Sequence, residues 1–172
     1  MRFPRIFIAL LFACLLPLNS GSAQNQGDID AINQLLDRYT EFEEAMDMTA
    51  QASLMSEDRV WIGPGMGRRT DQGKNMQIQQ AQFDLTKDAI PGIKWFVDDT
   101  ERLLRFYGNG RVAVVSFFRY PTYIIPASAP SDMAETLAAT PPMAMTMVME
   151  KSGGEWKIVH SHISNLNPPT GG

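Results

Sequence analysis

Two histidines lie close together near the end of this 172-residue chain, and they are its only histidines. His160 and His162 belong to residues 155–164, a run whose composition is typical of a β-strand. Because side chains alternate along a strand, we expect one face of this strand to carry Trp156, Ile158, His160 and His162. An imidazole titrates near neutral pH, so each histidine is a candidate general acid or base.

Two other interpretations of the histidine pair are open on the sequence. In the first, both imidazoles form hydrogen bonds with neighbouring backbone or hydroxyl groups and only stabilise the strand. In the second, the pair binds a metal ion, but such a site needs a third or fourth ligand from a carboxylate or a thiol. The one cysteine, Cys14, falls in an N-terminal segment that we expect to be removed. We therefore predict no metal site and no cofactor.

An acidic cluster, made of Asp98, Asp99 and Glu101, lies on another predicted strand. Alternation places Asp99 and Glu101 on the face that also carries Trp95, Val97 and Leu103. If one member of the cluster is buried, its raised pKa would make it a general-base candidate. The alternative is a solvated strand face near the edge of a sheet.

Four methionines alternate along a predicted strand, at Met143, Met145, Met147 and Met149. Methionine fills irregular apolar space and adapts to varied neighbours. If this face points outward it suits a dimer interface, and if it points inward it suits a hydrophobic ligand pocket. A copper site built from thioethers is a further alternative to a simple core stripe.

The first 23 residues have the three parts of a secretory signal peptide. Arg2 and Arg5 give a basic start, residues 6–18 form an apolar run, and Gly21 and Ala23 are small residues at the expected cleavage site. We expect cleavage after Ala23 and a periplasmic or secreted location. A lipoprotein anchor at the single cysteine is the alternative.

The remainder, residues 24–172, has the usual length of one domain and is long enough to bury a core without disulfides. The whole chain carries a formal net charge of −4, and removal of the two N-terminal arginines makes it more acidic. The sequence contains no basic stripe of the kind that binds nucleic acid. We therefore expect neither nucleic acid nor, after cleavage, a membrane as a partner.

Helical periodicity dominates the first half of this domain. Apolar residues recur every three to four positions over residues 28–46, where Asp28 is the expected N-cap. A shorter helix is predicted over residues 48–55, and a third over residues 71–85 with Asp71 as its cap.

Strand patterns dominate the second half. Long β-rich runs cover residues 93–107 and 111–125, and Gly108-Asn109-Gly110 between them is a strong hairpin signal. Residues 126–142 are rich in Pro and Ala and are expected to form a long loop with one helical turn. Shorter strands are predicted over residues 59–62, 66–70, 143–151 and 155–164, followed by a disordered tail over 165–172.

Helices that precede a run of antiparallel strands predict an α+β fold, with the helices packed on one face of the sheet. If the long sheet curves over these helices, it forms a cone. A pocket is then expected between the sheet and the helices.

Two segments of the chain resemble the SnoaL-like branch of the nuclear transport factor 2-like superfamily: residues 54–64, LMSEDRVWIGP, and residues 154–164, GEWKIVHSHIS. The second segment is also similar to the association domain of calcium/calmodulin-dependent kinase II. The resemblance covers nearly all of residues 24–164. It implies a cone-shaped α+β barrel with a deep pocket, commonly assembled as a homodimer through the exposed face of the sheet.

The resemblance implies no single reaction, because its members include isomerases, cyclases, dehydratases, epoxide hydrolases, small-ligand binders and structural oligomerisation domains. We predict an exported domain that binds a small, mostly apolar molecule and carries out proton-transfer chemistry, with His160 or His162 as acid or base. The expected pocket walls are Tyr39, Trp61, Phe118 and Tyr120. The alternative is a non-catalytic module for ligand binding or dimerisation.

Overall fold

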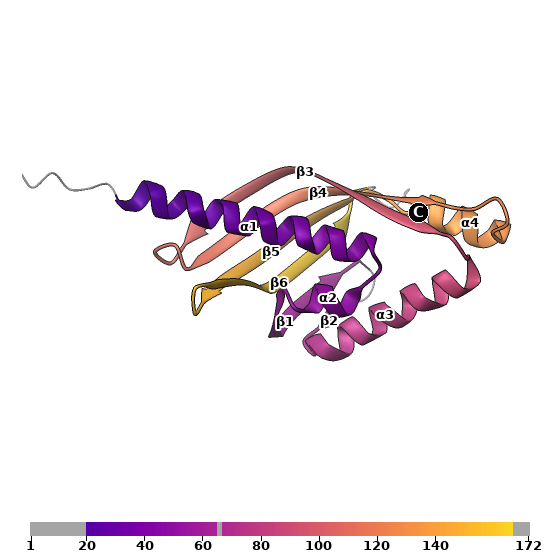
Figure 1. Ribbon diagram of the computed structural model, residues 1–172, viewed down its shortest axis with the longest axis horizontal. Helices are drawn as coiled ribbons and strands as arrows, with labels where there is room; N and C mark the ends of the chain where they lie inside the picture. Colours follow the sequence, from indigo (N-terminus) through magenta and orange to yellow (C-terminus); the bar gives the residue numbers. More distant parts are fainter. Residues whose placement is uncertain (1–19, 65–66, 167–172) are drawn as a thin grey trace, which may run out of the picture.

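The computed structural model describes residues 20–64 and 67–166, and its helices and strands are labelled in Figure 1. The predicted signal peptide, residues 1–23, falls almost wholly outside the described residues, and so does most of the predicted tail, residues 165–172. The described residues contain no helix that is both long enough and apolar enough to span a membrane.

The helices of the described residues are α1 (Ser20–Glu44), α2 (Met48–Ala52), α3 (Gln72–Ala89) and α4 (Ser131–Ala138). The predicted N-cap at Asp28 is wrong, because α1 begins eight residues earlier. Asp28 lies inside the helix, where its carboxylate accepts hydrogen bonds from Lys151 Nζ at 2.5 Å and Trp156 Nε1 at 3.1 Å. The predicted cap of the third helix is confirmed, since the Asp71 side chain accepts a hydrogen bond from the Lys74 amide.

The strands of the described residues form one six-stranded sheet in the order β2-β1-β6-β5-β4-β3. Neighbouring strands are antiparallel except for β1 and β6, which are parallel and bring the C-terminal strand into the middle of the sheet. The strand bounds are β1 (Met55–Gly63), β2 (Gly67–Arg69), β3 (Lys94–Tyr107), β4 (Val112–Ile124), β5 (Met143–Ser152) and β6 (Glu155–Asn165).

The predicted hairpin between the two long strands is confirmed. Gly108, Asn109 and Gly110 all have positive φ angles, a conformation that glycine and asparagine adopt at low cost. Beyond Arg119, β4 pairs only with β3, so Pro121 lies where one side of the strand has no ladder partner in β5. The missing N–H of the proline therefore removes no hydrogen bond between β4 and β5.

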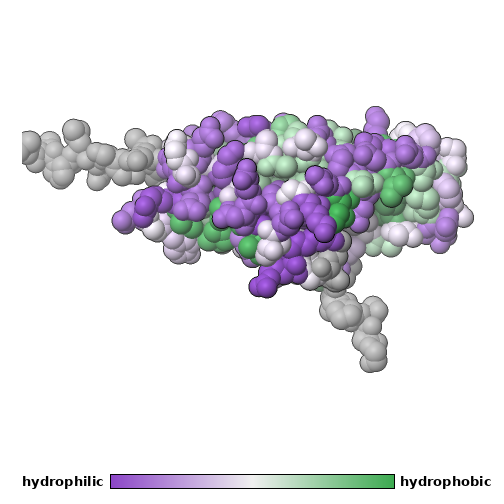
Figure 2. All heavy atoms as spheres, turned by 90° about the horizontal axis from the view of Figure 1, so that it is seen from below, coloured by the Kyte–Doolittle hydropathy of each residue, from purple (hydrophilic) through white to green (hydrophobic). Residues whose placement is uncertain are grey.

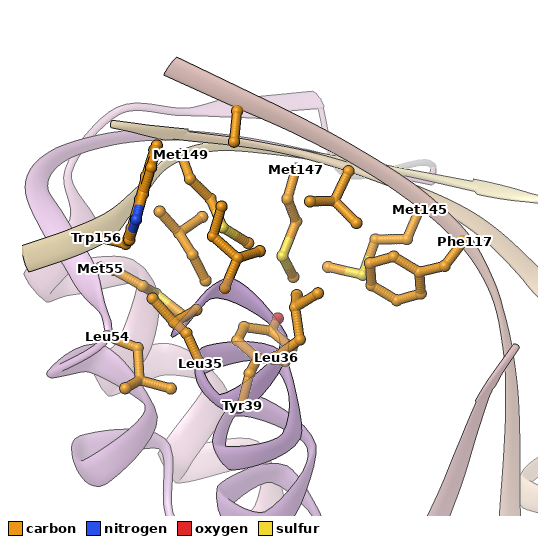
Figure 3. Close-up of a cluster of buried hydrophobic side chains, with 14 of the residues drawn as sticks. Leu35, Leu36, Tyr39, Leu54, Met55, Phe117, Met145, Met147, Met149 and Trp156 are labelled. Carbon is orange, nitrogen blue, oxygen red and sulfur yellow. The ribbon is translucent and has the colours of Figure 1, made fainter. Parts of the chain in front are cut away.

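The concave face of the sheet packs on α1 and forms the main core. Met145, Met147 and Met149 are each at most 1% exposed, which places the methionine stripe inward. Figure 3 shows these side chains and Phe117 reaching from the sheet toward Leu35, Leu36 and Tyr39 of α1. Thioethers suit this place, because flexible side chains can fill the uneven gap between a curved sheet and a helix.

A second hydrophobic cluster lies where α3 and α4 meet the ends of β3 and β4. Its buried members are Met46, Ile90, Ile93, Trp95 and Val97. α4 occupies the same end of the molecule in Figure 1. Figure 2 shows a largely hydrophilic surface on one side of the molecule, with hydrophobic patches at this end and also toward the opposite end.

The predicted α+β class is confirmed. α1 lies across the concave face of a curved sheet, and the other helices lie toward one end of the molecule (Figure 1). We call the opposite, convex side of the sheet the outer face. It is defined by the half-buried residues that alternate with the core: Val60 and Ile62 on β1, Val114 and Phe118 on β4, and Val148 on β5.

Candidate functional site

The concave face of β4 ends in a buried arginine. Ala113, Val115 and Phe117 alternate along this face, and Arg119 continues the series with only 2% of its side chain exposed. Its guanidinium holds Asp99 with two parallel hydrogen bonds, Nε to Oδ1 and Nη2 to Oδ2, both 2.8 Å long. Two parallel bonds of this kind are the strongest geometry between arginine and a carboxylate.

Two further groups come from α1 and complete what we call the Arg119 cluster: Arg119, Asp99, Glu43 and Thr40. Arg119 Nη1 lies 2.5 Å from Glu43 Oε2. The Thr40 hydroxyl, one helical turn earlier, donates to Asp99 Oδ2 at 2.7 Å. One cation is thus held between two carboxylates on facing elements, and this fixes the last turns of α1 on the sheet.

Local backbone geometry explains why Asp99 faces inward. It pairs directly with Arg119 across the hairpin and follows the buried Trp95 and Val97 in the same phase. A bulge then interrupts β3 between Thr100 and Leu103, where Glu101 has a φ of 55°. The prediction that Leu103 shares a face with Asp99 is wrong, because the bulge changes the alternation after Thr100 and leaves Leu103 half exposed.

The charges of the cluster shift the pKa values of its neighbours. Burial by itself would lower the pKa of Arg119, but Glu43 and Asp99 more than offset that effect, so its pKa is raised. Burial raises the pKa of Tyr39, and the negative charge of Glu43 raises it further. Burial and Glu43 also raise the pKa of Tyr123. Both phenols therefore keep their protons at neutral pH.

Tyr39 lies directly against the cluster, with its ring centroid 5.2 Å from Arg119 Cζ. Of the four predicted wall residues, Tyr39 and Trp61 are both buried on the inward side. The other two predicted wall residues, Phe118 and Tyr120, lie on the outer face, and 41% of Tyr120 is exposed.

A second buried arginine, Arg59 on β1, is 1% exposed. Met55 of β1 pairs with Ile158 of β6, but the next paired residues are Val60 and His160. The segment from Met55 to Val60 therefore contains more residues than the segment of β6 that lies beside it. This irregularity brings the Arg59 guanidinium against the thioether of Met55. Burial lowers the pKa of Arg59 from its ordinary value.

A hollow of about 220 Å³ opens beside α3 at the end of the cone that carries the second hydrophobic cluster. Tyr123 contributes to its wall and packs on Trp95, with ring centroids 4.1 Å apart. Phe83 meets Trp95 edge-on at 6.3 Å. The lining residues are Gln79, Gln82, Phe83, Thr86 and Tyr123.

The histidines lie on the outer face of β6, and the prediction that they share a face with Trp156 is wrong. Val148 pairs with His160 and Met149 with Ile158, so Val159 is an extra residue in β6. This bulge reverses the alternation, so that Ile158 and Ser161 point inward while His160 and His162 point outward.

The surroundings of the two imidazoles are those of a sheet surface. His160 pairs with Val60 and His162 with Ile62 on the neighbouring strand. Burial lowers the pKa of His160, and the charges of His162 and Arg59 lower it further. Within the described residues, no group of three or more His, Cys, Asp or Glu side chains is placed to hold a metal ion.

Sequence reasoning named Asp99 but missed Arg119, Glu43 and Arg59. The sequence signal for both arginines was a charged residue at a position where the alternating pattern of the strand places an inward-facing apolar residue. Arg119 follows Phe117 at the inward spacing, and Arg59 precedes the buried Trp61 at the same spacing. Glu43 carries no comparable signal, because it is one of several acidic residues near the end of α1.

Comparisons with known proteins agree on the fold. Residues 32–168 match the SnoaL-like domain. An NTF2-like protein with a cystatin-like fold from Novosphingobium aromaticivorans superposes with a TM-score of 0.67 at 15% identity, covering 87% of this chain and 89% of that chain. No curated protein matches the chain.

Two other similar structures carry names of reactions. Hexachlorocyclohexane dehydrochlorinase LinA-type3 from Novosphingobium barchaimii has a TM-score of 0.65 at 13% identity, covering 85% of this chain and 92% of that chain. A candidate scytalone dehydratase from Novosphingobium aromaticivorans has a TM-score of 0.63 at 11% identity, covering 84% and 88%. At such identities the likeness is one of fold.

Proposed function

This chain belongs to the SnoaL-like family, and we propose that its interior binds a small, mostly apolar molecule and transfers a proton to or from it. The observation that carries the proposal is the buried Arg119 cluster on the concave face. Two carboxylates and a guanidinium lie there between a helix and a sheet whose other side chains are mainly apolar.

Glu43 is the group we assign to proton transfer. Asp99 uses both of its oxygens on Arg119 and its side chain is 4% exposed, whereas the Glu43 side chain is 15% exposed. Glu43 Oε2 accepts from Arg119 and, at 3.3 Å, from Gln51, and among the described residues Oε1 has no hydrogen-bond donor. The free oxygen can take a proton from a bound molecule while Arg119, itself oriented by Asp99, holds the carboxylate in position.

Neutral phenols supply the complementary part of the chemistry. Removal of a proton from a carbon next to a carbonyl leaves negative charge on the carbonyl oxygen, which a nearby hydrogen-bond donor stabilises. Tyr39 and Tyr123 are such donors, because phenols are neutral at neutral pH, and burial and the charge of Glu43 raise their pKa values further. The hollow beside Phe83 and Tyr123 is the entry that we assign to the substrate. This arrangement suits isomerisation, dehydration or a related elimination.

The names of two structural neighbours, a dehydrochlorinase and a candidate dehydratase, belong to this broad class of reaction. They provide an analogy, and the carboxylate cluster provides the physical argument. The competing function is a non-catalytic binding module. It is favoured by the completeness of the Arg119 pairing, which a purely structural network would also have.

The proton-transfer proposal can be tested with 5-nitrobenzisoxazole, a small aromatic probe that opens when a base removes its one reactive C–H proton. We expect the purified protein to accelerate the reaction, and Glu43→Gln to lower that rate about 100-fold, the typical contribution of a general base. Glu41→Gln is the matched control, because it removes the same charge from an exposed position on the same helix. Equal rates for wild type and Glu43→Gln would contradict the assignment and favour the binding module.

Export and self-association belong to the same proposal. We infer that residues 1–23 direct the chain to the periplasm or the outside of the cell, and that two copies pair through the outer face. Apolar side chains of β1, β4 and β5 form that face around His160 and His162. Analytical sedimentation at micromolar concentration should give twice the monomer mass, and a monomer would exclude the dimer.

A further inference from the structure

Arg59 is a buried cation with no carboxylate neighbour in the part of the chain that the structure describes. Its side chain is 1% exposed, and no described Asp or Glu lies within salt-bridge distance of it. Nη1 donates to Gln72 Oε1 at 3.3 Å and contacts the thioethers of Met55 and Met76. A neutral amide and two thioethers are weak partners for a full positive charge.

Burial without a counter-ion is unfavourable for a guanidinium, because the charge loses water and gains no opposite charge in return. Arg59 Nε is fully buried and has no hydrogen-bond partner among the described residues, and it belongs to the edge of the guanidinium formed by Nε and Nη2. That edge is the one through which arginine holds a carboxylate with two parallel bonds.

The other unsatisfied polar atoms nearby are also donors. Ser161 is 0% exposed and points inward from β6 beside Trp61, two residues along the strand from Arg59. Within the described residues its hydroxyl has no partner, and neither has Asn75 Nδ2 on the α3 face that carries Gln72. A hydroxyl and an amide N–H can both donate to an anion. Among the described residues, this part of the interior therefore offers several donors and no carboxylate to accept from them.

We propose that Arg59 is the recognition group for a carboxylate carried by the small molecule that the interior binds. The inference rests on the proposed function, and it names the substrate class as an apolar body with one carboxylate. The anion would take the Nε edge of Arg59, with Ser161 as a further donor. Met55 and Met76 would swing aside to admit it, as flexible thioether side chains can do at low cost.

Tyr39 links this position to the Arg119 cluster. Besides burial and Glu43, which raise its pKa, the charges of Arg119 and Arg59 both act to lower it. The phenol is thus within electrostatic reach of both arginines and of Glu43. A molecule anchored at Arg59 would extend past Tyr39 toward Glu43, which gives a carboxylate-bearing substrate a defined orientation for proton transfer.

The test compares two probes that differ only in charge, 3-phenylpropionate and 3-phenylpropionamide, by calorimetric titration of the full chain. In wild type the carboxylate should bind at least about tenfold more tightly than the amide. Arg59→Met should erase that difference. Arg68→Met, at an exposed position on β2, is the matched control and should preserve it. The Nε–H resonance of Arg59 should move with the carboxylate and stay in place with the amide.

Each result separates the two levels of the argument. If both probes bind equally and Arg59→Met changes neither affinity, the proposed binding of a small molecule stands and the role of Arg59 is overturned. If neither probe binds at millimolar concentration, both the proposed binding and the role of Arg59 are overturned. Should Arg59→Met fail to fold, Arg59→Lys keeps the charge but loses the planar pair of donors. It should then weaken 3-phenylpropionate binding without affecting the amide.

Discussion

The two buried arginines of the described residues differ in their partners far more than in their burial. Arg119 and Arg59 are 2% and 1% exposed, respectively. Arg119 holds two carboxylates and lies within 3.4 Å of a threonine hydroxyl, whereas Arg59 meets one amide and two thioethers. A paired cation fixes elements to one another. An unpaired one reduces stability unless something else supplies the negative charge.

The difference also divides the interior into two functional parts. At the Arg119 cluster, the pairing of Arg119 and Asp99 leaves Glu43 as the group with a free oxygen. At Arg59, the donors outnumber the acceptors. The first arrangement suits a positioned acid or base, and the second suits recognition of an anion.

The largest effect is expected for Arg119→Met, which leaves Asp99 and Glu43 facing each other without a cation. Breaking a buried ion pair by removal of one partner typically costs about 3–5 kcal/mol of folding free energy. Urea unfolding monitored by tryptophan fluorescence would measure the loss. Arg105→Met, at an exposed position on β3, is the control and should change little. A loss at Arg119 no larger than that of the control would mean that the cluster does not hold α1 on the sheet.

A smaller, pH-dependent effect is expected at Tyr39, between the two arginines. Its folded-state pKa is raised above the ordinary value of 10.0, mainly by burial. The folded state then holds its proton more tightly than the unfolded chain does. Stability from this group is fully present below pH 10 and declines as the pH rises through the folded-state pKa. Between pH 8 and pH 11, the free energy of unfolding should therefore fall less steeply for Tyr39→Phe than for wild type. An equal pH dependence in the two proteins would argue against a buried phenol.

A still smaller effect on the pH dependence of stability is expected from His160 on the outer face. The pKa of His160 is lowered from 6.5 by partial burial and by nearby positive charge. The neutral imidazole is favoured in the folded state, so its contribution is present above pH 6.5 and is lost as the pH falls through the lower folded-state pKa. His160→Asn should flatten this acid limb slightly and leave turnover of 5-nitrobenzisoxazole unchanged. A large fall in turnover would return the catalytic role to the histidine strand.

Much of the fold follows from periodicity in the sequence. The helix over residues 28–46, the cap at Asp71 and the glycine-rich hairpin each depend on local patterns that tertiary contacts then reinforce. The alternating methionines likewise identified a single strand face. What alternation cannot reveal is which face points inward, because that depends on where the helices pack.

The prediction that the histidines share a face with Trp156 failed for a more specific reason. A single extra residue, Val159, shifts the phase of β6 by one, and every side chain after it changes face. A valine in a β-rich run gives no sign of a bulge. The Arg119 cluster was hidden in another way, since its partners lie 20 and 76 residues away in the chain and meet only when α1 packs on the sheet.

The most direct test of the central comparison is the unfolding free energy of Arg59→Met in protein freed of bound small molecules, set beside that of wild type. Because methionine removes an uncompensated charge and keeps the apolar length of the side chain, we predict stability equal to wild type or higher by about 1 kcal/mol. The same substitution at Arg119 should act in the opposite direction. A loss of about 3 kcal/mol or more at Arg59 would show that its charge is already paired in the folded chain, and would contradict the account.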